Sequence, residues 1–302
     1  MLILDRGPFP GAKLSAGLTR ETNAFLADDF QVGKQPEVWV IHHIRLWAIP
    51  DPNTTSVPGP GDLFKTVELY GGLASDVPPL GQKPNGDCDC HNLSSLKKAF
   101  LEPGSATTDN PDVVVTSSSQ HDGPETWQLD FQNLKWSVPG GKSIQFGILA
   151  EGRQNHAAAS RFGWHYLASP GTGGDHLRIF SREGKLQRSF QEGGSARVNI
   201  QVWGHLLAKI SIRTARQEFR VILQNQPFLK ADQVEASSLR FGPGRALPAK
   251  VGVEDVDDNG QPALVMSFRA SDSGLEPRSV NACLTGRRTD GAPFEGCDLL
   301  RH

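Results

Sequence analysis

The stretch Val38-Trp39-Val40-Ile41-His42-His43-Ile44-Arg45-Leu46-Trp47 decides the fold class, because large apolar side chains recur in it at every second position. Successive side chains point to opposite faces of a β-strand. One face would carry Val38, Val40, His42, Ile44 and Leu46, and the other Trp39, Ile41, His43, Arg45 and Trp47. The pattern predicts a strand with apolar residues on both faces.

Similar patterns continue along the chain. Trp127, Leu129 and Phe131 alternate with polar residues, as in a half-buried strand of an antiparallel sheet. Further strands are predicted at 144–148, 177–180, 186–190, 197–203, 210–212, 219–223, 238–241 and 264–268. The 32 glycines and 21 prolines favour turns over long helices. We therefore predict an all-β protein, with a jelly-roll-like β-sandwich and a second, smaller β-sandwich.

The length of 302 residues favours two domains, because a single hydrophobic core seldom grows this large. Residues 1–22 have no apolar period and are expected to form an N-terminal arm. A β-sandwich is expected over residues 23–205, followed by a small C-terminal β module over 206–302. The proline- and glycine-rich range 51–105 is expected to be a long insertion, with a short helix from Leu93 to Leu101 capped by Asn92 or Ser94.

The charge is nearly balanced, with 31 Lys and Arg residues against 33 Asp and Glu residues. No basic stripe is interleaved with aromatic residues, so nucleic acid is not an expected partner. No window approaches the roughly 20 apolar residues that span a bilayer, so no transmembrane segment is expected. The start, from Met1 to Arg6, has too few apolar residues for a signal-peptide core, so either a leader has been removed from this sequence or the protein is not exported.

The four cysteines form two close groups, Cys88 with Cys90 and Cys283 with Cys297. The second pair brackets a short glycine-containing loop of the kind that disulfides close. This spacing predicts a disulfide between Cys283 and Cys297. It favours an oxidising compartment, and so an extracytoplasmic location: periplasmic, cell-surface or secreted.

A candidate calcium site lies at Asp255, Asp257 and Asn259, ahead of Gly260. A loop could turn these oxygen atoms toward a hard cation such as Ca²⁺. The bidentate glutamate of an EF-hand loop is absent, so a turn without metal is the alternative.

A second candidate metal site is Cys88, Cys90 and His91, whose sulfur and nitrogen atoms suit zinc or copper. The C-x-C spacing is tighter than in zinc knuckles, and no second cluster supplies further ligands. A loop held by disulfides is the alternative.

The candidate binding surface is the strand face with Trp39, His43, Arg45 and Trp47. Flat rings beside a guanidinium can stack on a sugar or grip a protein partner. The alternative is that this face packs into the core, since a tryptophan-rich face fills a sandwich as well as an aliphatic one does.

Sequence motifs for catalysis are absent. The chain has no G-x-S-x-G elbow, no H-E-x-x-H motif, no phosphate-binding loop and no dinucleotide fingerprint. The adjacent pairs His121-Asp122 and Asp175-His176 lie in glycine-containing loops without a nucleophile and are expected to be polar turns. No catalytic residue is therefore predicted.

Two regions resemble known modules. The segments 27–30, 38–44 and 198–204 are similar to a β-sandwich domain of bacterial secreted and surface-anchored proteins, and this resemblance covers about residues 20–204. The segments 234–243, 254–260, 282–286, 290–291 and 294–298 resemble a small C-terminal module of bacterial extracellular proteins, over about residues 206–302. The second resemblance implies export and an accessory, non-catalytic role.

We therefore expect a non-catalytic accessory or structural subunit of an exported or membrane-peripheral assembly, with protein subunits as its partners. A carbohydrate-binding or adhesive module is the first alternative, and it requires Trp39 and Trp47 to be exposed. A secreted hydrolase is the second, and it requires a deep pocket that gathers histidine and carboxylate side chains.

Overall fold

The structure is a computed structural model of the 302-residue chain. It describes residues 1–6, 14–18, 25–50, 61, 64–73, 93–103, 105–118, 126–152, 164–171, 178–180, 186–189, 195–215, 217–256, 260 and 262–300. The chain divides into two compact units. The N-terminal unit comprises Leu2–Val32 and Ile41–Trp203, and the C-terminal unit comprises Met1, Gly33–Val40 and Gly204–His302.

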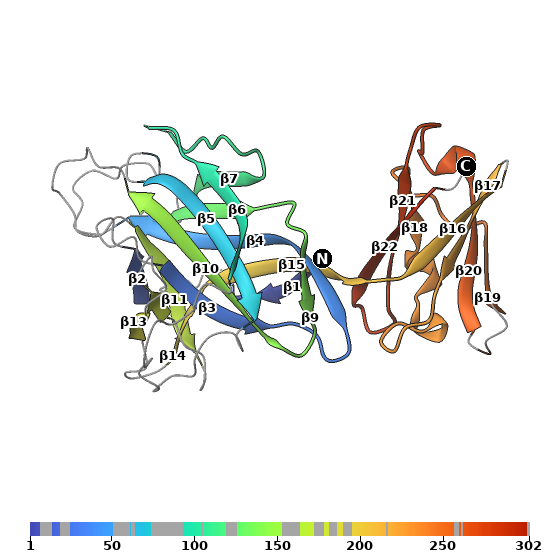
Figure 1. The fold of residues 1–302 in the computed structure, drawn as a ribbon, viewed down its shortest axis with the longest axis horizontal. Coiled ribbons are helices and arrows are strands. Elements are labelled where there is room, and N and C mark those ends of the chain that lie inside the picture. Colours follow the sequence, from blue (N-terminus) through green and yellow to red (C-terminus); the bar gives the residue numbers. More distant parts are fainter. Residues whose placement is uncertain are drawn as a thin grey trace. The chain divides into compact units, whose positions relative to one another are not determined.

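The all-β prediction is confirmed, since both units are built from strands in several sheets (Figure 1). The strands that begin in the N-terminal unit are β1 (Leu2–Asp5), β2 (Leu14–Leu18), β3 (Phe25–Gln31), β5 (Phe64–Leu73), β6 (Ser94–Phe100), β7 (Val113–Ser118), β8 (Thr126–Phe131), β9 (Trp136–Pro139), β10 (Ser143–Gly152), β11 (Trp164–Gly171), β12 (Arg178–Phe180), β13 (Leu186–Ser189), β14 (Ser195–Val198) and β15 (Ile200–Leu207). Strand β4 (Val38–Pro50) starts in the other unit's segment and continues into this one.

The N-terminal unit has two sheets. One has the order β13-β12-β3-β10-β5-β6. The other contains β14, β11, β4 and β15, with β1 paired to β15, β2 to β11, and β8 and β9 to β4. Phe30 on β3 packs on Phe146 of β10 with ring centroids 5.7 Å apart. In the second sheet, Ile44 and Phe131 lie opposite each other and are both fully buried. Each sheet therefore contributes large apolar side chains to the interior of this unit.

The predicted helix from Leu93 to Leu101 is wrong, because this segment forms β6 and pairs with β5. Lys97 and Lys98 form ion pairs with Asp112 and Glu68, so the lysines hold a strand rather than a helix face. The predicted insertion at 51–105 also needs correction, because it contains β5 and β6 of the six-stranded sheet.

The start of the chain also differs from an irregular arm. Strand β1 pairs with β15 and β2 pairs with β11, so backbone hydrogen bonds order both segments. Backbone pairing of this kind needs no apolar period, which explains why the sequence pattern did not indicate these strands.

The C-terminal unit has a four-stranded sheet of order β16-β17-β20-β19, and a second layer in which β22, β21 and β18 are neighbours and β22 pairs with the end of β15. Its elements are β16 (Ile210–Ala215), β17 (Glu218–Leu223), η3 (Ala231–Gln233), η4 (Ala236–Ser238), β18 (Arg240–Phe241), β19 (Lys250–Asp255), β20 (Pro262–Arg269), η5 (Ala270–Asp272), β21 (Asn281–Arg287) and β22 (Pro293–Leu299). Phe241 packs on Phe219 and Phe268, with ring centroids 5.4 and 4.9 Å away. These rings join the two layers into a small sandwich core.

Gly296 shows how closely the layers of this unit approach. A Cβ atom at this position would lie 2.6 Å from the Ala208 carbonyl oxygen. Real Cβ atoms do not come this close to backbone, so only glycine fits.

Candidate interaction site

The predicted face of β4 does not offer an aromatic platform. Trp39 is 6% exposed and Trp47 is 4% exposed, so neither indole can stack on a sugar from solvent. His43 and Arg45 are half-buried on the same strand. The interpretation that this face packs into the core therefore fits the structure. The carbohydrate alternative required exposed Trp39 and Trp47, and both indoles are buried.

His43 and Arg45 belong to a buried polar network in the N-terminal unit. Asp130 lies directly opposite Arg45 on the neighbouring strand β8. One carboxylate oxygen, Asp130 Oδ1, lies 2.5 Å from His43 Nε2 and accepts a hydrogen bond from Arg45 Nε at 2.8 Å. The other, Oδ2, accepts from Gln128 Nε2 at 2.6 Å. The carboxylate is thus saturated by protein donors.

Trp203 covers this network. Its ring stacks on the His43 imidazole with centroids 4.2 Å apart and an interplanar angle of 11°. The Arg45 guanidinium lies 5.2 Å from the same ring centroid, within the range of a cation–π contact. Burial by itself raises the pKa of Asp130, but the hydrogen bonds from His43, Arg45 and Gln128 bring it below its usual value. The network therefore holds a stable carboxylate and acts as a structural ion pair.

A second buried ion pair explains the position of Trp39. Glu37, 2% exposed, accepts hydrogen bonds from Trp39 Nε1 at 3.1 Å and from the Lys34 backbone N–H at 2.9 Å. Its other oxygen accepts from Arg288 Nη1 at 2.8 Å. Arg288 also donates to the Phe228 carbonyl and to the Asp290 carboxylate. These contacts fix segment Gly33–Val40 as part of the C-terminal unit.

Of the calcium candidates, Asp255 lies at the end of β19, whereas Asp257 and Asn259 lie outside the described residues. Asp255 Oδ2 accepts a hydrogen bond from the Gly260 backbone N–H at 2.8 Å. This contact joins the end of β19 to Gly260. Calcium binding at this loop stays a prediction. Cys88, Cys90 and His91 also lie outside the described residues.

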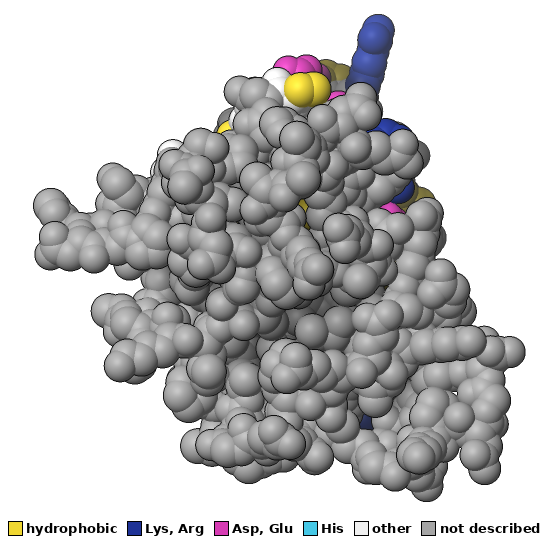
Figure 2. Space-filling model, turned by 90° about the vertical axis from the view of Figure 1, so that its left-hand side faces the viewer, with side chains coloured by type: hydrophobic (Ala, Val, Ile, Leu, Met, Phe, Trp, Pro, Cys, Tyr) yellow, Lys and Arg dark blue, Asp and Glu magenta, His cyan; other side chains and the backbone are white. Residues whose placement is uncertain are grey.

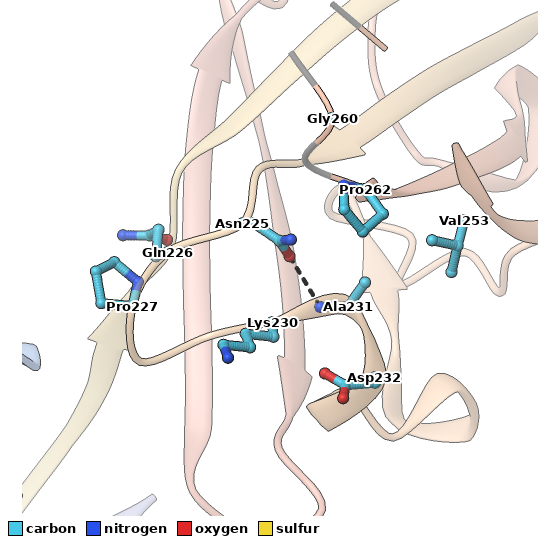
Figure 3. Close-up of a pocket in the computed structure, with 9 residues that line it drawn as sticks. All are labelled: Asn225, Gln226, Pro227, Lys230, Ala231, Asp232, Val253, Gly260 and Pro262. Atoms are coloured by element: carbon cyan, nitrogen blue, oxygen red, sulfur yellow. Dashed lines mark hydrogen bonds between the residues drawn. The ribbon is translucent and has the colours of Figure 1, made fainter. Parts of the chain in front are cut away.

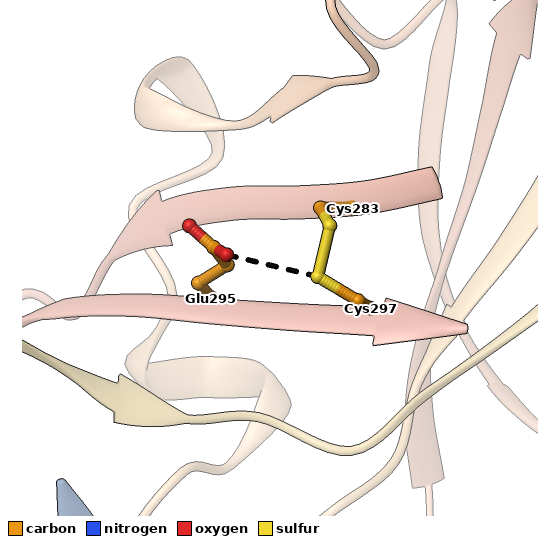
Figure 4. Close-up of side chains that lie close together, drawn as sticks. All are labelled: Cys283, Glu295 and Cys297. Carbon is orange, nitrogen blue, oxygen red and sulfur yellow. Dashed lines mark hydrogen bonds between the residues drawn. A yellow bond between two sulfur atoms is a disulfide. The ribbon is translucent and has the colours of Figure 1, made fainter. Parts of the chain in front are cut away.

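The predicted disulfide between Cys283 and Cys297 is confirmed. The two cysteines lie directly opposite each other on β21 and β22. Glu295 points toward the same place, with its carboxylate oxygen 3.6 Å from Cys297 Sγ (Figure 4). These three residues have the donor types of a metal site, but the disulfide engages both sulfur atoms. The cluster is therefore a covalent cross-link between two strands.

The C-terminal unit has an accessible sheet edge at strand β19. It is the last strand in the order β16-β17-β20-β19. Val251 is 37% exposed and Val253 is 58% exposed, and they lie opposite the buried Met266 and Leu264 of β20. Their side chains thus continue the inner, apolar face of the sheet to its border. An edge strand also directs alternate backbone N–H and C=O groups away from its own sheet.

A pocket of about 620 Å³ lies beside the end of this edge. Figure 3 shows Val253 and Pro262 on one side of it and the Asn225–Asp232 segment on the other. Asn225 Oδ1 accepts a hydrogen bond from the Ala231 backbone N–H at 3.0 Å, which shapes that segment. Lys230 and Asp232 supply charges of both signs, and histidine is absent from the described lining. The lining suits a mixed polar and apolar contact better than acid–base chemistry.

Sequence analysis missed this edge. The signal was present as Val251 and Val253 two positions apart, but Lys250, Gly252 and Glu254 around them have low strand propensity. The strand forms because β20 supplies a continuous pairing partner.

Surface charge, membrane-spanning helices and comparisons with known proteins give no further information about the β19 edge. The described side chains visible in Figure 2 include apolar, basic and acidic groups close together at its upper margin. Within the described residues, no helix is both long and apolar enough to cross a membrane. No protein-family model matches the chain, and no curated protein matches it either.

Proposed function

We propose that this protein is a non-catalytic accessory or structural subunit of an exported or membrane-peripheral assembly, and that it acts by protein–protein contact. The observation that carries the proposal is the β19 edge, where Val251 and Val253 expose apolar surface beside a strand border that pairs with no further strand among the described residues. Edges of this kind bind partners by adding a strand to the sheet. Charged side chains, which commonly protect sheet edges, also lie on this strand at Lys250 and Glu254, so a partner that uses the edge must pair with them.

The other features support a role in binding. The described ionisable clusters around Asp130 and Glu37 are saturated by hydrogen bonds and form ion pairs rather than a nucleophile with a base. Burial of Trp39 and Trp47 counts against a carbohydrate platform. The disulfide between Cys283 and Cys297 supports an extracytoplasmic location, because such bonds persist in oxidising compartments.

The test compares native mass for three forms isolated gently from cells that make the protein. We expect the unchanged chain to be part of a complex with a native mass larger than the 32.8 kDa of one chain. Val253→Asp puts a charge on the edge and should release the chain from that complex. Val280→Asp is the matched control, because Val280 is also exposed, at 73%, and lies outside β19. A lone chain in all three samples would contradict the proposal.

A further inference from the structure

We propose that the partner at this edge is a second copy of the same chain, paired antiparallel along β19 across a two-fold axis at Gly252. This inference rests on the proposed function and names the partner of the same site. The pairing would join two four-stranded sheets into one continuous sheet. It is an isologous contact, in which the same surface faces itself.

The sequence of β19 is self-complementary in this register. With Gly252 opposite Gly252 of the second copy, Val251 lies opposite Val253 and Lys250 lies opposite Glu254. The two-fold axis repeats both pairs. Apolar and opposite-charge pairs directly across antiparallel strands stabilise a sheet. The four positions of each copy that flank Gly252 in this register, Lys250, Val251, Val253 and Glu254, are thus matched by type.

The faces of the sheet also agree with this register. Val251 and Val253 lie on the inner face, opposite Met266 and Leu264, whereas Lys250 and Glu254 lie on the other face. A shift by one residue would place inner against outer side chains, since side chains alternate with a period of two. A shift by two would place Val251 opposite itself or opposite Asp255, and would lose the pairing of Lys250 with Glu254.

Nothing in the described part of the chain requires glycine at position 252. A Cβ atom added there meets nothing within 4 Å, and Gly252 is not among the glycines with a positive φ. Glycine inside a strand weakens it, and it often marks a place where another backbone approaches closely. At the two-fold axis, two glycines would face each other and leave the main chains free to pair.

The opposite edge of the same sheet, strand β16, is a less suitable edge for pairing with a second copy. On β16, the Ile212 backbone N–H donates to Asp298 Oδ2 of β22 at 3.1 Å, so this border is engaged by its own unit. Across the described residues, Lys250 has no ion pair, and Glu254 pairs only with the exposed Arg220. Lys250 is therefore available to a second copy, and Glu254 can meet it through Oε1, since Arg220 contacts Oε2.

The first test is sedimentation of the full chain over a range of concentrations at low salt, where exposed ion pairs are least screened. A contact of one strand edge is small, so we expect a dissociation constant on the order of micromolar. Lys250→Glu and Glu254→Lys each place like charges opposite each other twice, and each should raise the dissociation constant about tenfold. The double swap Lys250→Glu with Glu254→Lys should restore it, with thermal unfolding confirming that each variant folds.

The second test fixes the register by cross-linking. Opposite Cα atoms in an antiparallel pair lie about 4.5–5.5 Å apart, which suits a disulfide. Gly252→Cys should therefore form a covalent dimer under mild oxidation. Val251→Cys is the control, because its copy lies at a diagonal position about 7–8 Å away, beyond disulfide reach. Equal cross-linking of both variants, or none above the unchanged chain, would overturn the register.

The outcomes separate this inference from the proposed function. A chain that stays monomeric alone, yet leaves its native assembly on Val253→Asp, overturns self-pairing and keeps the protein–protein role. A chain that is monomeric alone and in its source overturns both. A dimer whose dissociation constant is unchanged by Lys250→Glu and by Glu254→Lys has its interface elsewhere, and this result overturns the pairing of β19.

Discussion

Glu37→Gln tests the buried ion pair that holds segment Gly33–Val40 in the C-terminal unit. Glu37 is 2% exposed and accepts hydrogen bonds from Arg288, Trp39 and the Lys34 backbone. A neutral amide would place an N–H₂ group against one of these donors and leave Arg288 without this carboxylate. Breaking a buried pair from one side costs about 3–5 kcal/mol. Because Arg288 keeps its contact with Asp290, we expect the lower end, about 3 kcal/mol.

The assay is urea unfolding followed by tryptophan fluorescence, with the midpoint and slope compared between variants. The matched control is Arg220→Gln, which removes the exposed pair with Glu254 from a strand away from the sheet edge and should cost less than about 1 kcal/mol. A loss for Glu37→Gln no larger than that of Arg220→Gln would refute the reasoning.

Three further predictions follow from the titrating groups and the disulfide. The pKa of Asp130 is lowered in the folded chain, so its contribution to stability is present above the unfolded pKa of about 3.9 and is lost as the pH falls below that value. Asp130→Asn should therefore reduce the loss of stability at acid pH. An unchanged loss in this variant would contradict the stabilising role of the network. Burial lowers the pKa of His205 to about 4 from 6.5, so the unfolded state binds more protons between these pH values. The free energy of unfolding should therefore fall as the pH drops from 6.5 to about 4. His205→Gln should remove this pH dependence, measured by urea unfolding at several pH values. Replacing Cys283 and Cys297 by alanine removes a cross-link between residues 14 positions apart and should lower the free energy of unfolding by about 3 kcal/mol. Calorimetry measures this loss relative to the oxidised chain, and the reduced chain should show a similar loss.

Local pattern predicted the strands whose apolar residues alternate. β4, β8 and β10 carry such a pattern, whereas β17 and β20 have short runs of consecutive apolar residues, and each forms where the sequence indicated. β6 was mistaken for a helix because its lysines and leucine suit either structure, and its partners Glu68 and Asp112 are distant in sequence. Pairing with β5 decides the conformation, and a local pattern does not contain that information.

The candidate site shows the same limit. Trp39 and Trp47 were identified as notable side chains, but a strand with two apolar faces does not reveal which face solvent reaches. Asp130, which ties His43 to Arg45, lies 85 residues from Arg45, so the network follows from topology alone. The edge at β19 depends on strand order in the sheet, which no single segment specifies.

The most direct measurement is backbone amide hydrogen exchange of residues 250–255, compared between the native assembly and the isolated chain at high dilution. If β19 is the contact, its outward amides gain hydrogen-bond acceptors, and their exchange should slow by at least about tenfold in the assembly. Exchange at the same rate in both samples, with protection gained elsewhere, would show that the protein makes its contacts through another surface.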